Sequence, residues 1–356
     1  MSAEGGAQWA WLGLLKWSLS YTDGTSDSPM APMDPEKKAF LEAVMKDGIL
    51  DENERMKEIL VRMSTAMEGF QNGAAATAAT DTTEVEELED LLLELRDIVE
   101  QIDYARCFCS LQGLPFLLGC IQEREAVPES IRLACLGVMA TLCQNNPPVQ
   151  LQLLELGSIR ILSDLFFIET SASASDKNKA KIIQAMSANV RNHETAEQVF
   201  CQVEQACEIF EHGLRGGEQL KTRTLFFLRA LITADTSDRA SVRLFSTSVA
   251  HIADSFLQEE NGFQIRELSL ELLNDILDQK KSVNVLLGER KNRLAALGVQ
   301  RVSALRKLVG EEREFASQEL EQWEKLLIQL ARAVPDEEEE VLLIGDGQPA
   351  PVSLPQ

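Results

Sequence analysis

The sequence offers few side chains that are suited to catalysis. Only three histidines occur in 356 residues: His193, His212 and His251. None stands beside a serine or cysteine nucleophile in a catalytic motif. The chain also has no glycine-rich phosphate loop and no His-Glu-x-x-His motif, and its carboxylates are too numerous for one acid–base pair to stand out. We therefore expect no enzymatic activity, no catalytic residues and no cofactor.

Cysteine is the other residue type that could carry chemistry. The chain has seven cysteines, an odd number without the spacing of a disulfide framework. Cys107 and Cys109 could begin a zinc site, but no further cysteine or histidine stands at a distance that would complete four ligands. Most of the cysteines fall within apolar helical patterns. We expect buried free thiols in a reducing compartment, and no metal.

The charge balance narrows the class of partner. The formal net charge is −23 and the isoelectric point is about 4.6, a field that repels nucleic acid and anionic membranes. Neither is expected as a partner. The acidity can serve solubility alone, or it can steer a basic patch of a partner protein toward the chain, and composition leaves both open.

The first residues show no recognisable targeting signal. The stretch from Trp9 to Leu19 is apolar but short, Lys16 interrupts it, and no basic region precedes it. This pattern fits neither a secretory signal peptide nor a membrane-spanning helix. The expected location is the cytoplasm.

Hydrophobic periodicity indicates helices throughout the chain. From Glu84 onward, apolar residues recur at steps of three and four, which places them on one helical stripe with acidic residues opposite. The stripe comprises Val85, Leu88, Leu92, Leu95, Val99 and Ile102. No stretch shows sustained strand alternation with hairpin turns. The pattern predicts an all-α fold.

The pattern then repeats as far as about Gly288. Each unit ends in a long apolar helix, which a polar turn and a shorter helix follow. The long helices are expected at about 129–143, 177–190, 219–233 and 264–277. Their ends align at Cys143, Val190, Ile232 and Leu277, which are 47, 42 and 45 residues apart in the numbering. This period is typical of armadillo or HEAT repeats, and Gly157 stands where a C-cap glycine would end one helix.

The predicted architecture is an armadillo- or HEAT-like α-solenoid of about four repeats with helical N- and C-terminal caps. We expect five segments, each described by its range. They are a mobile N-terminal segment with a short amphipathic helix (1–33), a helical cap with a low-complexity connection at 73–83 (34–103), the repeats (104–288), a C-terminal helical cap (289–334) and an acidic, proline-containing disordered tail (335–356).

Equivalent helices of a solenoid place equivalent residues side by side, so polar residues in register are candidates for partner binding. Lys181 and Arg223 each lie nine residues before the end of their helix, an unusual pair in so acidic a chain. The same two residues could instead pair with neighbouring Glu or Asp side chains. The same comparison of equivalent positions gives three further candidates, which are Asn145, Asn192 and Phe226.

Several short motifs occur in an order and spacing that resembles a known family. They are Leu14-Leu15-Lys16-Trp17-Ser18, Met33-Asp34-Pro35-Glu36, Ile102-Asp103-Tyr104-Ala105, Gln144-Asn145-Asn146, Val190-Arg191-Asn192-His193 and Leu220-Lys221-Thr222-Arg223. Together they resemble the armadillo-type nucleotide exchange factors of heat-shock protein 70, the cytosolic Fes and heat-shock-protein-70-binding factors. Tyr104 replaces the family's asparagine, a glycine is missing near 203–205, and Ser248 stands where another glycine is usual.

The resemblance implies a function and a partner. It implies a co-chaperone that binds the nucleotide-binding domain of a cytosolic heat-shock protein 70 and accelerates release of ADP, with Ala105 and Arg223 as contact residues. It also implies that the N-terminal segment helps to eject substrate, and we expect a monomer. The alternatives are a generic armadillo scaffold with another client and the endoplasmic-reticulum branch of the same family, against which the missing signal peptide argues.

Overall fold

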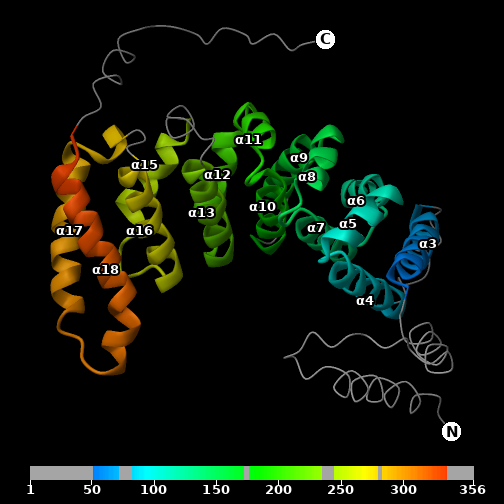
Figure 1. The fold of residues 1–356 in the computed structure, drawn as a ribbon, viewed down its shortest axis with the longest axis horizontal. Helices are drawn as coiled ribbons and strands as arrows, with labels where there is room; N and C mark the ends of the chain where they lie inside the picture. The colour runs from blue at the N-terminus through cyan, green and yellow to red at the C-terminus, as the bar shows by residue number, and fades with distance from the viewer. Residues whose placement is uncertain (1–50, 72–81, 172–175, 235–243, 280–282, 335–356) are drawn as a thin grey trace, which may run out of the picture. The chain divides into compact units, whose positions relative to one another are not determined.

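A computed structural model of the chain describes residues 51–71, 82–171, 176–234, 244–279 and 283–334 (Figure 1). The predicted segments 1–33 and 335–356 lie outside these residues, as does most of the predicted connection at 73–83. The chain divides into two compact units, Met1–Ser64 and Thr65–Gln356. The division falls within helix α3 (Glu52–Gln71), and the helices from α4 onward belong to the second unit.

The described secondary structure is helical throughout, without a strand, as the sequence predicts. The helices of the second unit are α4 (Thr82–Ile98), α5 (Ile102–Ser110), α6 (Gly113–Gln122), α7 (Glu129–Leu142), α8 (Pro147–Glu155), α9 (Ser158–Ser171), α10 (Asp176–Val190), α11 (Glu194–Cys201), α12 (Ala206–Arg215), α13 (Glu218–Thr233), α15 (Ser246–Ser255), α16 (Phe263–Asp278), the 3-10 helix η1 (Val283–Leu286), α17 (Glu289–Leu305) and α18 (Glu311–Arg332). The four predicted long helices are α7, α10, α13 and α16, and their bounds agree with the predicted ones to within a residue.

The helices of this unit stack in rows (Figure 1). The long helices α4, α7, α10, α13, α16 and α18 each pack on the next, and we call them the long-helix row. Helices α6, α9, α12, α15 and α17 form a second row, and α5, α8 and α11 contact one another in a third. Three helices per unit is the armadillo arrangement, whereas the sequence pattern suggested one short helix between long ones. Gly157, with φ of +75°, ends α8 as predicted and separates the two short helices.

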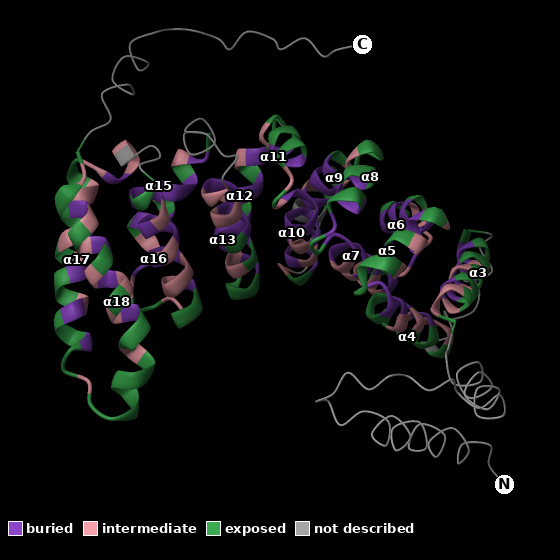
Figure 2. Ribbon diagram, viewed as in Figure 1, coloured by how far each residue is buried: buried purple, intermediate pink, exposed green. Residues whose placement is uncertain are grey.

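Burial explains why the long helices are apolar on more than one side. In α16 the buried side chains include Ile265, Leu270, Leu273 and Ile276, because neighbours pack on both flanks. Figure 2 shows buried residues along the facing sides of the helices in this row. Each fully buried leucine or isoleucine contributes about 1.5–3 kcal/mol relative to an exposed one. Stacking of neighbours therefore holds the unit together.

The predicted stripe from Val85 to Ile102 does not form one helix. Leu88, Leu92 and Leu95 are buried on α4 as expected, but that helix ends at Ile98. Ile102 begins α5 instead and is 44% exposed. The extended backbone of Gln101 turns the chain between the two helices, so the apolar spacing continues in sequence while the helix axis changes.

A buried glutamine joins two helices of one repeat. The Gln150 side chain on α8 donates from Nε2 to the carbonyl oxygens of Ala188 (2.9 Å), Asn189 (3.2 Å) and Arg191 (2.9 Å). These carbonyls belong to the end of α10, where the helix itself supplies no donors. One side chain therefore caps the long helix of its own repeat and fixes its end beside Arg191.

A buried ion-pair cluster joins the C-terminal helices to the last repeat. Glu319 on α18 is 2% exposed and accepts hydrogen bonds from Arg301 Nε (2.8 Å) and Arg266 Nη2 (3.1 Å). Burial alone would raise the pKa of Glu319, but the two guanidinium groups outweigh it and the pKa lies below its usual value. The predicted C-terminal helical cap is thus tied to α16 by charge as well as by packing.

No described helix on its own has the length and apolarity needed to cross a membrane. Helices α5 and α6 meet that test only as a pair, and the chain bends by 79° between them. Their side chains Phe108, Leu114 and Leu117 are buried within the unit.

Candidate partner-binding surface

Five of the six predicted site residues lie on or at the ends of the long-helix row. Lys181 is on α10, Arg223 and Phe226 are on α13, and Asn145 and Asn192 follow the ends of α7 and α10; Ala105 is on α5. The structure brings Lys181 and Arg223 together in one cluster, and it brings Asn192 and Phe226 together in one pocket. It does not bring Asn145 or Ala105 to either place.

Lys181 and Arg223 form the centre of a group of like charges. Burial lowers the pKa of Lys181, and the positive charges of Arg223, Arg96 and Lys177 lower it further. These cations come from three helices of the long-helix row, α4, α10 and α13. Within the described parts of the chain, neither Lys181 nor Arg223 forms an ion pair. The alternative that they pair with neighbouring acidic side chains is wrong.

Like charges held together in this way favour an acidic ligand. Each cation raises the local potential that the others experience, and an incoming carboxylate relieves that repulsion. The remainder of the chain is strongly acidic, with a net charge of −23. The cluster therefore marks one place on the long-helix row where a negatively charged protein surface would be attracted and not repelled.

Asn192 and Phe226 line a shallow pocket of about 320 Å³ between the end of α10 and α13. The other residues of its wall are Arg191, Arg229, Ala230, Thr233 and Ala234. The guanidinium carbon of Arg191 lies 4.7 Å from the centre of the Phe226 ring, a cation–π contact. Phe226 is 42% exposed, a large aromatic surface for a side chain on a packed helix.

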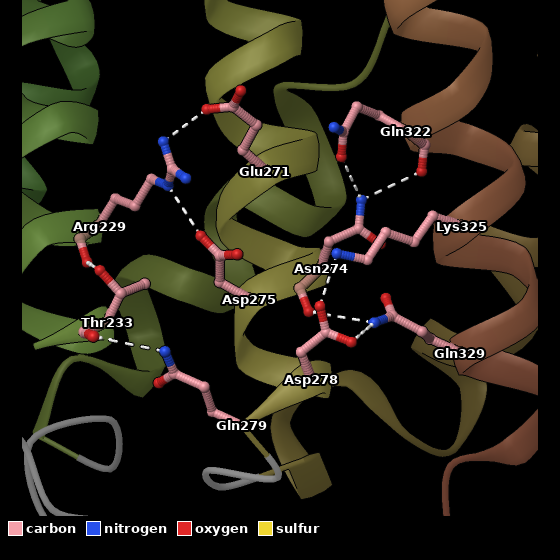
Figure 3. Close-up of polar contacts among 10 residues, drawn as sticks. All are labelled: Arg229, Thr233, Glu271, Asn274, Asp275, Asp278, Gln279, Gln322, Lys325 and Gln329. Carbon is pink, nitrogen blue, oxygen red and sulfur yellow. Dashed lines mark hydrogen bonds and ion pairs between the residues drawn. The ribbon is translucent and has the colours of Figure 1, made fainter. Parts of the chain in front are cut away.

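Beyond this pocket the polar residues of the row bond to one another (Figure 3). Arg229 on α13 pairs with Glu271 (2.5 Å) and Asp275 (2.8 Å) on α16. Further along, Asn274 Nδ2 donates to Gln322 Oε1 of α18 at 2.9 Å, and Lys325 pairs with Asp278. These contacts join successive helices. The C-terminal half of the row therefore uses its charges internally, whereas Lys181 and Arg223 form no ion pair among the described residues.

The two asparagines have a backbone reason for their identity. Asn145 and Asn192 adopt φ values of +51° and +59°, the left-handed conformation that asparagine tolerates better than most residues. Both are exposed, and each stands where a long helix ends and the next short helix begins. Their equivalent positions follow from the repeat, so a contact role for Asn145 stays a prediction.

Ala105 differs from the expectation. Its side chain is 1% exposed, on the packed side of α5, and its N–H donates to Gln101 O at 2.9 Å. This burial does not support the contact role that the resemblance implies for Ala105, and that role stays a prediction. A larger side chain at this position would first disturb the packing of α5.

The histidines and most of the cysteines take part in helix capping or in packing. His193 caps α11 by accepting from Ala196 N–H at 3.2 Å, and the rings of His212 and His251 pack edge-on against Phe167 and Phe256. None of the seven cysteines forms a disulfide, and four of them, Cys109, Cys120, Cys135 and Cys143, are buried as expected. In the described ranges, no group of three or more His, Cys, Asp or Glu side chains is arranged to hold a metal ion.

Sequence reasoning missed Arg191, Arg96 and Lys177. Arg191 stands beside Asn192 in the Val190–His193 motif, and a search for basic residues at helix ends would have found it. Arg96 gave no such signal, because its place beside Lys181 depends on how α4 packs against the repeats. Register along the chain predicts residues in equivalent positions, and it does not predict neighbours from the cap.

Comparison with known proteins agrees with this structure. Residues 12–107 match the family model described as nucleotide exchange factor Fes1. Hsp70-binding protein 1 of Mus musculus is 26% identical over 318 residues, which is 88% of this chain and 84% of that protein. For the Homo sapiens protein of the same name, identity is 26% over 65% of this chain and 62% of that protein. The Hsp70 nucleotide exchange factor fes1 of Schizosaccharomyces pombe is 26% identical over 62% of this chain and 71% of its own length.

Solved structures agree on the fold. A designed armadillo repeat protein superimposes with a TM-score of 0.51 at 13% identity, over 69% of this chain and 94% of its own. An engineered protein superimposes with the same TM-score at 11% identity, over 75% of this chain and 97% of its own. The chain is thus similar to Hsp70-binding protein 1 and to the Hsp70 nucleotide exchange factor fes1, and its fold is armadillo-like.

Proposed function

We propose that this protein is a nucleotide exchange factor of an Hsp70-type chaperone. It binds the nucleotide-binding domain and accelerates release of ADP, which promotes release of the chaperone's substrate. The names of the similar proteins support an Hsp70 chaperone as the partner. The observation that points to a particular binding surface is that Lys181 and Arg223 lie together on the long-helix row and form no ion pair in the part of the chain that the structure describes. Arg223 and Lys181 are the proposed primary contacts, with Phe226, Asn192 and Asn145 beside them.

The mechanism is a coupling of two binding equilibria. The protein binds better to the chaperone domain whose nucleotide cleft is open than to the closed form. Linkage then requires that it weakens ADP binding by the same factor by which ADP weakens its own binding. A coupling of about 1.4 kcal/mol corresponds to a tenfold change in affinity. No bond is made or broken, so the function needs no catalytic residue on this chain.

Charge reversal at the cluster tests the proposal. We expect the double variant Arg223→Glu with Lys181→Glu to bind the chaperone domain at least about tenfold more weakly, because it replaces attraction to carboxylates by repulsion. ADP release should slow to the rate of the chaperone alone. Binding is followed by calorimetry, and release by the fluorescence of labelled ADP.

A matched control separates the cluster from general charge effects. Arg160 lies on α9, outside the long-helix row, and its side chain is 89% exposed. Arg160→Glu makes the chain more acidic without touching the cluster and should bind normally. Unchanged binding of the double variant would contradict the proposed contact surface, whereas a wild type that does not bind the chaperone domain would favour the generic scaffold with another client. A cytoplasmic location and a monomeric state stay predictions.

A further inference from the structure

The pocket beside the cluster contains a guanidinium whose hydrogen bonding is incomplete. Arg191 Nε donates to Ser187 O at 3.3 Å, and the group lies over the Phe226 ring. Among the described residues, no acceptor takes the remaining N–H groups, and no carboxylate pairs with the charge. Burial lowers the pKa of Arg191, which shows that the cation has lost part of its hydration.

The arginine on the opposite wall of the pocket already has its ion-pair partners. Arg229 is held by Glu271 and Asp275 of α16, so its charge is already neutralised (Figure 3). Ala230 and the exposed face of Phe226 supply apolar surface between the two arginines. Among the residues that line the pocket, Arg191 is therefore the cation without a carboxylate partner, and an apolar floor lies beside it.

Packing of the repeats does not require this arrangement. In the register of the long-helix ends, Arg191 corresponds to Gln144 and Thr233, and Phe226 corresponds to Gln184 and other non-aromatic residues. Residues that the solenoid needs recur from unit to unit. The Arg191–Phe226 pair occurs at one junction, between α10 and α13, next to the Lys181–Arg223 cluster.

We propose that this pocket binds the carboxylate of an aspartate or glutamate side chain on the chaperone's surface, an inference that rests on the proposed function. A guanidinium donates two parallel N–H···O bonds to one carboxylate, and the ring beneath Arg191 holds its plane for that contact. Carbon atoms of the incoming side chain pack on Phe226 and Ala230. The pocket is a second anchor, distinct from the cluster.

Three variants test the pocket by affinity for the chaperone's nucleotide-binding domain. Arg191→Gln removes the charge and should weaken binding by about 10- to 100-fold, the effect of losing a charged hydrogen-bonding pair. Arg191→Lys keeps the charge but loses the two-pronged geometry, and its affinity should lie between those of wild type and Arg191→Gln. Phe226→Leu, which removes the ring beneath the guanidinium, should also weaken binding.

The salt dependence of the affinity distinguishes a charge contact from a purely structural role of Arg191. Affinity of the wild type should fall with added salt more steeply than that of Arg191→Gln, because a charge contact is screened. Arg191→Gln that binds like wild type, while the Arg223→Glu, Lys181→Glu variant fails to bind, overturns the pocket and leaves the proposed function intact. A wild type that does not bind the domain at all overturns both. Should Arg191→Gln melt at a lower temperature, equal affinities of Arg191→Lys, Phe226→Leu and wild type would overturn the pocket.

Discussion

Glu319 illustrates how a single residue can fix the end of a solenoid. A carboxylate that is 2% exposed is tolerated because Arg266 and Arg301 both donate to it. Removing one member of such a buried group leaves the others desolvated and unpaired, which is more damaging than the loss of the attraction itself. The loss of stability on removing Glu319 is therefore expected to come mainly from Arg266 and Arg301, which remain desolvated without it.

Glu319→Gln should lower the free energy of unfolding by about 3–5 kcal/mol, because two largely buried arginines lose the anion between them and Arg301 keeps only its exposed partner Glu259. Urea unfolding followed by circular dichroism at 222 nm measures the change. Glu324→Gln is the control: its pair with Arg306 is exposed on both sides and contributes at most about 1 kcal/mol. Equal effects of the two substitutions would contradict the role of burial.

The same carboxylate predicts a pH dependence. The pKa of Glu319 is lowered in the folded state, relative to about 4.3 for an unperturbed glutamate. Its stabilising contribution is therefore fully present above pH of about 4.3 and is lost as the pH falls through the lower folded value. Wild type should lose more stability than Glu319→Gln in this acidic range. If the urea midpoints of wild type and Glu319→Gln fell in parallel as the pH is lowered, this prediction would be contradicted.

At this scale the sequence predicted register better than exposure. Lys181 and Arg223 were found because they occupy equivalent positions, and the structure places them together. The burial of Ala105 could not be predicted, because the packed side of a nine-residue helix depends on where α4 ends and α5 begins. The contact of Arg191 with Phe226 depends on side-chain conformations across two repeats, which no spacing along the chain encodes.

Close packing between elements is visible at one glycine. Gly213 on α12 faces α13, where an added Cβ would lie 2.3 Å from Thr224 Oγ1. Thr224 is fully buried and donates to Leu220 O at 2.7 Å, so it has little room to move. The two helices therefore approach each other at a distance that only a residue without a side chain permits.

Gly213→Ala should destabilise the protein by about 1–3 kcal/mol, because the new methyl group overpacks the α12–α13 contact. Thermal or urea unfolding checks this. Gly137→Ala on α7 is the matched control: a Cβ there meets nothing within 4 Å, and alanine is favoured over glycine within a helix by about 0.5–1 kcal/mol. If Gly213→Ala were as stable as Gly137→Ala, the close approach would be refuted.

The long helices were the most predictable elements. The expected range 129–143 became Glu129–Leu142, and 264–277 became Phe263–Asp278. Their wide apolar surface and the breakers at their ends are local signals. The short helices were less predictable, because α5 and α6 or α8 and α9 are separated by only a brief turn. A period of about 45 residues does not show whether two helices or three fill each unit.

At the scale of the whole molecule, nearest-neighbour stacking explains why the fold could be read from the sequence. Each repeat packs on the next, so a recurring apolar pattern is sufficient to predict the architecture. The proposed binding surface is not specified in that way. Register singled out Lys181 and Arg223, but only the contacts across helices show that these cations lie together without an ion pair and that Arg191 lies over Phe226.

Release of labelled ADP from the nucleotide-binding domain of an Hsp70 chaperone is the most direct test of exchange-factor function. The release rate should rise with the concentration of this protein and reach a plateau, and the Arg223→Glu, Lys181→Glu variant should leave the rate unchanged. Arg160→Glu should accelerate release as the wild type does. A release rate that stays the same at every concentration of the wild-type protein would contradict the proposed function.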